Sequence, residues 1–462
     1  MALLSSFSLP FHPDQKIKLT SKSQKNRISV LLGVNGTQKS SILRGLLEDG
    51  LFSQPEVEAL GARRRGPSCQ ATWHDSPPAR IVAVSSAATD RFPSKAGFGE
   101  ARILTRYDTA KYAYVGPRTG RNIVSRIQSV QSLLSEFLQA QSLPSSVSHF
   151  IEELSSKTSV PPLMSIRLQP RMVGPMMYER VAGASSFQSF LDGPTSASSA
   201  VIRSPRLTRF IAEARMQPAL MEEAERLFGK LVSKEFRHGI EMEFDLRSPS
   251  APDYRAVHFG LTAGFAGLTN AGMRFGTRDA VEPDAFSAGQ WGLFSSLVTV
   301  ALSVRDRTLL LIDEPENALH PAWQREYLMD LHRAISHSKE CHVVLATHSP
   351  LIVSSLAARE ADLIGLRLNE NKSVQAELLE IPVGWQATDV LEDIFDLPST
   401  RAPEVVARIE EAMQLIADGV DKNASKLQRA AKRLLPLLDS LPEDDVARQV
   451  IKSICRLGGV KT

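Results

Sequence analysis

The residues from Gly33 to Ser40 form a glycine-containing loop that could hold nucleotide phosphates. Glycines at its first and fourth positions would let backbone N–H groups turn toward phosphate oxygens. Lys39 would place a positive charge beside the β- and γ-phosphates, and the hydroxyl of Ser40 would be a Mg²⁺ ligand. The predicted nucleotide-binding residues here are Gly33, Asn35, Gly36, Thr37, Gln38, Lys39, Ser40 and Ser41.

Gln38 departs from the usual phosphate-loop pattern, in which a glycine precedes the lysine. A side chain at this position would change the geometry of the loop or crowd the nucleotide. A glycine-rich turn before an ordinary helix is therefore an alternative interpretation. We favour phosphate binding, because an apolar strand pattern at Arg27–Leu32 precedes the loop and a helical pattern at Ser40–Leu47 follows it.

Two carboxylates follow the apolar run Thr308–Ile312. A parallel strand presents its carboxyl end at the ligand crevice of an open α/β sheet. Asp313 would hold Mg²⁺ directly or through water, and Glu314 could polarise the attacking water. An ordinary acidic turn is the alternative, which the phosphate loop upstream makes less attractive.

Two further segments could complete a phosphate site. His348 follows the next apolar strand, His342–Ala346, and could contact the γ-phosphate, although a lone histidine at such a junction more often caps the strand end. Ser287, Gly289 and Gln290 precede a helical pattern, where backbone N–H groups form an anion site. Alone, these three residues would indicate only a helix cap.

The elements that position these residues alternate between apolar strands and helices. Strands buried along their whole length and separated by helices predict an α/β fold with a parallel sheet covered on both faces. We further expect helices within 118–157 and 206–235, an irregular segment at 158–205, and a helical tail after residue 361.

Composition excludes several classes of protein. The 462 residues carry a net charge of +3, 43% are hydrophobic and 23% are charged, which excludes a disordered or collagen-like chain. The three cysteines match no zinc or redox spacing, and no apolar run is long enough to span a bilayer. We expect a cytoplasmic protein without membrane contact. Arg63–Arg65 and the arginines Arg118, Arg121 and Arg126 could contact nucleic acid, but we favour solvated surfaces.

The motifs and their order resemble the ATP-binding-cassette (ABC) ATPases, in the soluble branch that includes the OLD-like, RecF-like and chromosome-maintenance ATPases. The matching segments are Gly33–Ser40 for Walker A, Ser287–Gln290 for the signature motif, Leu309–Glu314 for Walker B, Glu316–Pro321 for the D-loop and Ala346–Pro350 for the switch-histidine loop. The family's glutamine loop is not identifiable, because Ile81–Asp90 occupies its place and lacks a glutamine. The resemblance implies a P-loop ATPase head.

The resemblance also implies an organisation and a mechanism. Residues 1–117 and 261–385 would be the two lobes of the head, 118–260 a mainly helical insert, and 386–462 a helical C-terminal region. Two heads would pair head to tail in a homodimer or higher homo-oligomer, with ATP and Mg²⁺ between one Walker A loop and the partner's Ser287 and Gly289. Glu314 would be the catalytic base and His348 the γ-phosphate sensor.

The biological role rests on the same resemblance. OLD nucleases carry a further domain with clustered metal-binding acids, whereas Asp389, Glu392, Asp393 and Asp396 fit a helical face. Stand-alone ATPases of this size resemble subunits of Septu-, retron- and PARIS-type anti-phage systems, whose effector is a separate nuclease or toxin. The alternatives are a DNA-repair or chromosome-maintenance ATPase that contacts nucleic acid directly, and a nucleotide-binding scaffold without useful hydrolysis.

Overall fold

A computed structural model of the chain contains two compact units, Met1–Trp385 and Gln386–Thr462. The described residues are 3–10, 12–19, 26–52, 69–87, 89–94, 98, 107, 109–118, 126–140, 142–170, 186–192, 205–233, 239–249, 253–268, 273–277, 280–356, 361–369, 371, 373–381, 383–397 and 399–461. Arg63–Arg65 and Arg121 lie outside them.

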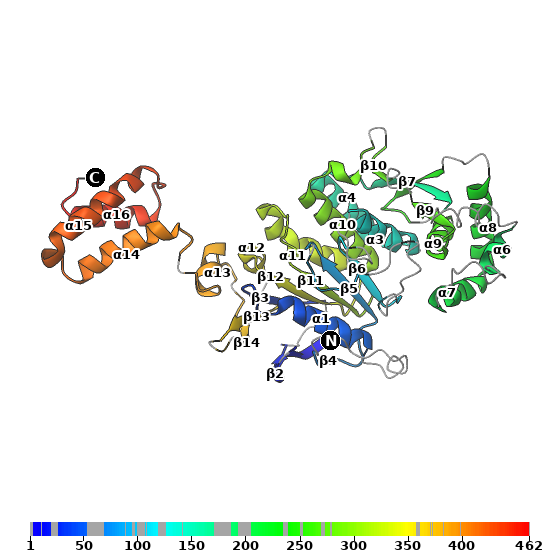
Figure 1. The fold of residues 1–462 in the computed structure, drawn as a ribbon, viewed down its shortest axis with the longest axis horizontal. Helices are drawn as coiled ribbons and strands as arrows, with labels where there is room; N and C mark the ends of the chain where they lie inside the picture. The colour runs from blue at the N-terminus through cyan, green and yellow to red at the C-terminus, as the bar shows by residue number, and fades with distance from the viewer. Residues whose placement is uncertain are drawn as a thin grey trace, which may run out of the picture. The chain divides into compact units, whose positions relative to one another are not determined.

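A seven-stranded sheet forms the centre of the first unit (Figure 1). Its order is β14 (Val374–Leu379), β13 (Ala361–Leu368), β3 (Arg27–Gly33), β12 (His342–Thr347), β11 (Thr308–Asp313), β5 (Arg80–Ser85) and β6 (Tyr112–Val115). All neighbouring pairs are parallel except β13 and β14. The predicted α/β class is confirmed, and the three strands that the apolar runs predicted, β3, β12 and β11, lie side by side.

Helices cover both faces of this sheet because its strands are apolar on both sides. Leu309 and Leu311 of β11 pack in one core with α1 (Lys39–Phe52). Side chains alternate along a strand, so Leu310 and Ile312 face the opposite side. The helix α10 (Ala288–Ser303) precedes β11, and α11 (Pro321–Ile335) connects β11 to β12. The helix α12 (Pro350–Ser354) follows β12. The N-terminal strands β1 (Leu4–Leu9) and β2 (His12–Lys18) form a small sheet with β4 (Ala71–Trp73).

The prediction of a helical tail directly after residue 361 is wrong. Residues 361–379 contribute β13 and β14 to the main sheet. β13 is held in register with β3 partly by a buried ion pair, in which Arg27 Nη2 lies 2.9 Å from Asp362 Oδ1. The apolar run of β13 is short enough to fit either a strand or a helix turn, and its partner β3 is more than three hundred residues away.

The region between the two halves of the head contains α3 (Arg126–Gln139), α4 (Ser145–Thr158), α6 (Phe187–Asp192), α7 (Pro205–Arg215), α8 (Pro218–Val232) and α9 (Asp253–Ala263). It also contains a second sheet, β10 (Arg274–Phe275), β7 (Leu163–Pro170) and β8 (Ile240–Asp245), with β9 (Ala266–Leu268) beside β7. The expectation of irregular structure at 158–205 is therefore wrong for β7. The prolines at its ends obscured the alternating strand pattern of its buried residues Met164, Ile166 and Leu168. The helix expected at 206–235 is two helices, because Pro218 starts α8.

The second unit is helical, as predicted for 386–462. It consists of α13 (Ala387–Asp393), α14 (Pro403–Ala417), α15 (Val420–Leu434), the 3₁₀ helix η4 (Leu435–Asp439) and α16 (Val446–Leu457). A core of its own includes Leu427, Leu434 and Ile451. In the described part of the chain, no helix combines the length and the apolar character needed to cross a membrane. The four-part division of the chain stays a prediction.

The burial of His342 should make the free energy of unfolding depend on pH. Burial lowers the pKa of His342 to about 3, while Asp362 opposes the shift. Its Nε2 lies 2.9 Å from Ser29 Oγ, and Leu4 N donates to its Nδ1 at 3.3 Å. Between the unfolded value of about 6.5 and this folded value, only the unfolded chain takes up the proton, so stability falls as pH falls by about 1.4 kcal/mol per pH unit.

Denaturant unfolding at pH 6.5, 5.5 and 4.5 checks this prediction. The variant His342→Gln can keep both hydrogen bonds but has no proton to bind, so its stability should fall less steeply than that of the wild type. Equal slopes for the two proteins would show that His342 does not contribute.

Candidate functional site

The carboxyl ends of β3, β12 and β11 bring the predicted nucleotide residues together. These strands are adjacent and parallel, so the loops after Gly33, Thr347 and Asp313 leave the same edge of the sheet. The loop after β3 leads into α1, whose first residue is Lys39. Sequence motifs separated by about three hundred residues therefore meet in one site.

Lys39 lies at the centre of this site and is buried, with 5% of its surface exposed. Its Nζ donates to Gly33 O at 2.8 Å and to Val34 O at 3.3 Å, and it lies 3.3 Å from His348 Nδ1. Burial lowers the pKa of Lys39 to about 8, although Glu314, Asp313 and Glu316 each favour the charged form. Lys39 is thus a desolvated cation with carboxylates around it, and a phosphate would be a strong partner for it.

Gln38 takes the backbone conformation that a glycine would normally supply. Its φ is +66°, in the left-handed region that costs a non-glycine residue about 1–2 kcal/mol. Its carbonyl accepts from Ser41 N and Ile42 N at 2.9 Å, which begins α1. Gln38 Oε1 is buried without a hydrogen-bond partner. Gln38 therefore keeps the backbone conformation that a glycine would have in this loop, but its positive φ costs conformational energy.

Alanine substitutions at the two glycines of the loop should lower the stability of the protein by different amounts. A Cβ at Gly33 would lie 2.5 Å from Leu366 O and 2.7 Å from Thr37 Oγ1, whereas a Cβ at Gly36 would meet no atom within 4 Å. Gly36 has a φ of +89°, so alanine there pays only for the backbone conformation, about 1–2 kcal/mol. Gly33→Ala must also displace backbone, so we expect it to lower the melting temperature more than Gly36→Ala. Equal melting temperatures would contradict this close approach.

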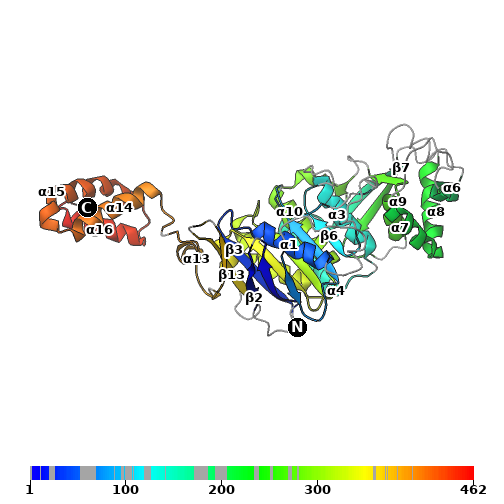
Figure 2. The ribbon, with the colours of Figure 1, turned by 60° about the horizontal axis from the view of Figure 1, so that its bottom comes forward.

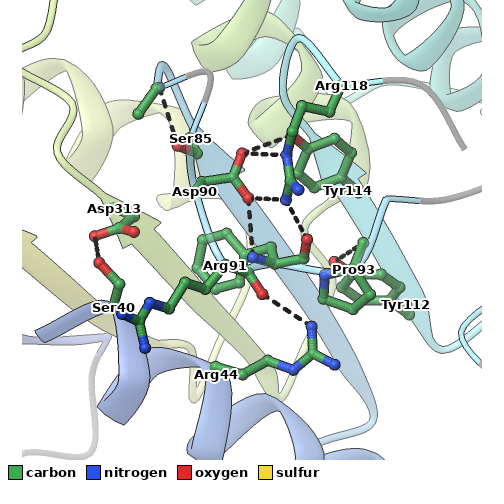
Figure 3. Close-up of polar contacts among 12 residues, drawn as sticks. Ser40, Arg44, Ser85, Asp90, Arg91, Pro93, Tyr112, Tyr114, Arg118 and Asp313 are labelled. Carbon is green, nitrogen blue, oxygen red and sulfur yellow. Dashed lines mark hydrogen bonds and ion pairs between the residues drawn. The ribbon is translucent and has the colours of Figure 1, made fainter. Parts of the chain in front are cut away.

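Ser40 and Asp313 form the pair that could hold a divalent cation. Ser40 Oγ donates to Asp313 Oδ1 at 3.1 Å (Figure 3). Burial is the main cause that raises the pKa of Asp313 to about 6, and the hydrogen bond from Ser40 opposes it. A hydroxyl and a carboxylate oxygen at this distance suit Mg²⁺, which in phosphate sites takes few protein ligands and completes its shell with water and phosphate. The described residues contain no cluster of three or more metal-binding side chains.

Glu314 is held where a catalytic base would be needed. Its Oε1 lies 3.1 Å from His348 Nε2, and Asn317 Nδ2 donates to its Oε2 at 3.1 Å. Glu314 has a φ of +49°, and its N–H donates to Ala346 O at 2.9 Å. The strained turn therefore carries the side chain away from the strand direction and toward His348. Non-glycine residues with positive φ are often found at functional sites.

His348 connects the lysine and the glutamate. Burial and the nearby Lys39 lower the pKa of His348, so the ring is neutral near pH 7. Lys39 Nζ can donate only to an unprotonated Nδ1, so the second ring nitrogen carries the proton and donates to Glu314. Lys39, His348 and Glu314 thus form one hydrogen-bonded chain.

Glu316 is a supporting residue to which the sequence assigned no separate role. His348 N donates to Glu316 Oε1 at 2.5 Å, and Glu316 Oε2 is buried without a hydrogen-bond partner. Burial raises the pKa of Glu316, and the bond from His348 opposes this shift. Its position two residues after Glu314 did not reveal this contact, because the contact depends on the neighbouring strand β12.

The signature segment lies at the beginning of α10. Ser287 is its N-cap: Gln290 N donates to Ser287 Oγ at 3.2 Å, and Ser287 N donates to Gln290 Oε1 at 2.9 Å. A Cβ at Gly289 would lie 2.6 Å from Ala318 O, so glycine allows the D-loop to approach α10. Within the described chain, Ser287 and Gly289 form no hydrogen bond with the phosphate loop. Gln290 serves the helix cap, and its role in nucleotide binding stays a prediction.

The segment after β5 lies beside the phosphate loop (Figure 3). Asp90 accepts from Tyr114 at 2.8 Å and is paired with Arg118, which is 8% exposed. The expected solvated position of Arg118 is therefore wrong, because Arg118 balances a buried carboxylate. Arg91 Nη1 donates to Ser41 Oγ at 2.7 Å. The residue directly after Ile81–Asp90 thus contributes an arginine contact to the first turn of α1, which the sequence pattern did not reveal.

Comparison with known proteins agrees with this geometry. A family model described as "AAA domain, putative AbiEii toxin, Type IV TA system" matches residues 28–354. The Septu protein PtuA of Bacillus thuringiensis is 32% identical over 107 residues, which cover 22% of this chain and 26% of that protein. The aligned segment thus spans about a quarter of the relative.

Two solved structures match the chain at low sequence identity. An inward-facing metal-chelate-type ABC transporter shares 15% identity, with 86% of this chain and 90% of that chain covered and a TM-score of 0.30. The Smc head bound to the C-winged helix domain of ScpA shares 10% identity, with 82% and 98% covered and a TM-score of 0.30. The fold assignment therefore depends on the sheet topology and the family model.

Proposed function

We propose that this chain, which belongs to the AAA-domain family of AbiEii-type proteins, binds ATP in the loop Gly33–Ser40. We further propose that it hydrolyses ATP with Glu314 as the base. The observation that supports this most directly is the contact of Lys39 with His348 and of His348 with Glu314. These three side chains come from three loops of the sheet edge. ATP turnover by the purified chain tests the proposal.

The site residues would divide the work of hydrolysis. Lys39 and the backbone N–H groups of the loop bind the phosphates and offset their charge. Ser40 and Asp313 would hold Mg²⁺, which when bound neutralises charge on the β- and γ-phosphates. Glu314 accepts a proton from the attacking water, and His348 orients Glu314 through its Nε2.

The signature segment would act on the nucleotide of a second copy of this chain. Ser287 and Gly289 lie at the N-terminus of a sixteen-residue helix, where N–H groups attract anions. They make no hydrogen bond with the phosphate loop of their own chain in its described part. A head-to-tail homodimer in which ATP lies between Lys39 of one chain and Ser287 of the other would use both anion sites.

The biological role that we propose is anti-phage defence, in which the ATPase holds a separate nuclease or toxin effector. The supporting observations are the family description and the match to the Septu protein PtuA. Affinity purification from the native host, with and without ATP, tests this role. We expect one nuclease or toxin to co-purify stoichiometrically, and purification of the ATPase alone in both conditions would contradict it.

A second candidate role, direct action on nucleic acid, is favoured by one surface. Lys422, Lys426, Arg429 and Arg433 are exposed on α15 at spacings of four, three and four residues, so they share one face. Arg433 lies 3.3 Å from Glu411, and the described chain shows no ion pair for the other three. Duplex binding that weakens steeply with salt, and that Lys422→Glu with Lys426→Glu removes, would favour this role over effector binding.

A further inference from the structure

The first helix of the insert contacts the signature segment through two polar side chains. Arg126, the first residue of α3, donates through Nη1 to Pro283 O and to Phe286 O, both at 2.9 Å. One turn later, Ser129 Oγ accepts from Trp291 Nε1 at 2.8 Å. Both views show α3 beside α10 (Figures 1 and 2). The insert therefore contacts the chain on both sides of Ser287.

The side chain of Arg126 contacts the segment before Ser287. Its partners are the carbonyls of the 3₁₀ helix η3 (Pro283–Ala285) and its C-cap residue Phe286. The ion pair with Asp284, at 3.5 Å, adds little because the Asp284 side chain is 80% exposed. The guanidinium thus stabilises the loop before Ser287 rather than α3.

The loop that Arg126 holds is packed on the other side by aromatic rings. Phe286 stacks on Trp291 with an interplanar angle of 17°, and Phe275 lies edge-on to both. Phe286 is also the residue directly before Ser287. A shift of α3 would therefore change the position of the Ser287 backbone relative to α10.

The same helix end is connected to the loop that follows Glu314. Gly289 lies against Ala318 O so closely that no Cβ would fit, and Asn317 donates to Glu314 Oε2. A continuous set of contacts therefore runs from Arg126 to the signature segment, and from Gly289 through the D-loop to Glu314. Packed contacts of this kind can transmit a displacement between two sites.

We infer that Arg126 is a positioning residue through which the insert sets the position of the signature segment, and that ATP-driven pairing of two chains depends on it. This inference rests on the proposed head-to-tail ATPase. It predicts that Arg126 affects the step in which Ser287 meets the partner's nucleotide. Binding of ATP to the Walker A loop of a single chain should not depend on Arg126.

Arg126→Gln removes the two-carbonyl contact, and Arg126→Lys keeps a donor of the same charge. For Arg126→Gln, we expect kcat and the ATP-dependent dimer fraction to fall about 10- to 100-fold, as expected for a misplaced catalytic group. The Kd of a fluorescent ATP analogue for the monomer should stay unchanged, and Arg126→Lys should recover part of kcat. Arg408→Gln, a partly exposed arginine of α14 paired with Glu404, is the matched control.

A wild-type kcat and dimer fraction in Arg126→Gln would overturn the inference while the proposed function stands. A wild type that neither binds nor hydrolyses ATP would overturn the proposed function itself. If Arg126→Gln does not fold, Ser129→Ala replaces it, because it removes the bond from Trp291 and the bond to Arg126 O but leaves the Arg126 side chain in place. The same loss of kcat with unchanged monomer affinity is then expected, and an unchanged kcat would overturn the inference.

Discussion

Replacing Glu314 with glutamine should lower ATP turnover by about 10²–10⁴-fold and leave ATP binding intact. Glutamine has nearly the same shape and its one amide oxygen can still accept from His348, but it cannot accept a proton from water. The structure places no other carboxylate in direct contact with His348 Nε2 within the described chain. Steady-state phosphate release and equilibrium binding of a fluorescent ATP analogue would measure the two effects separately.

The matched control is Glu410→Gln, an exposed glutamate of α14 in the separate C-terminal unit. It should have wild-type turnover. If Glu314→Gln also had wild-type turnover, the assignment of the base would be wrong. If the wild type, Glu314→Gln and Lys39→Ala shared one low rate, the chain would be a nucleotide-binding scaffold without useful hydrolysis.

Replacing Lys39 with alanine should weaken ATP binding by about 10- to 100-fold, as expected for the loss of a hydrogen bond between charged groups. The buried ammonium is surrounded by Glu314, Asp313 and Glu316, so its removal also leaves these carboxylates without a nearby cation. Their mutual repulsion would then oppose an anionic ligand further. Equilibrium binding and phosphate release should therefore both decrease, unlike the result for Glu314→Gln.

Lys111→Ala is a suitable control for Lys39→Ala. Lys111 is also partly buried, its pKa is lowered by burial, and its Nζ donates to Gly50 O at 2.7 Å at the far end of α1. The control should cost some stability but retain ATP affinity. Equal loss of affinity in both variants would show that α1 as a whole, rather than Lys39, determines binding.

The sequence predicted which residues meet at the sheet edge better than it predicted what surrounds them. Gly33 and Asp313 each end an apolar strand and His348 directly follows one, and strands buried on both faces leave a strong pattern in the sequence. Their meeting at one sheet edge followed from the expectation of a parallel sheet. The contact of Ser40 with Asp313 was likewise implied by their predicted shared ligand, although only the structure gives its distance.

Other features depended on contacts that no local pattern records. β7 was missed because prolines lie at both of its ends, and β13 because its partner β3 is distant in sequence. Arg118 seemed to belong to a solvated surface, since nothing near it in the sequence indicates the buried Asp90. Arg126 was expected on a helix face and instead binds carbonyls that lie about 157 residues later.

The central claim is that each nucleotide site combines Lys39 of one chain with Ser287 of another, and complementation between two inactive variants tests it most directly. Lys39→Ala disables the phosphate loop, and Ser287→Arg would block the signature segment while costing one helix cap, about 1 kcal/mol. A mixed dimer of the two variants has one intact composite site.

Phosphate release is measured for each variant alone and for an equimolar mixture that has been allowed to exchange subunits. The account predicts almost no turnover for either variant alone and about a quarter of wild-type turnover in the mixture, since half of the dimers are mixed and each has one intact site of two. A mixture that is no more active than the separate variants would contradict it.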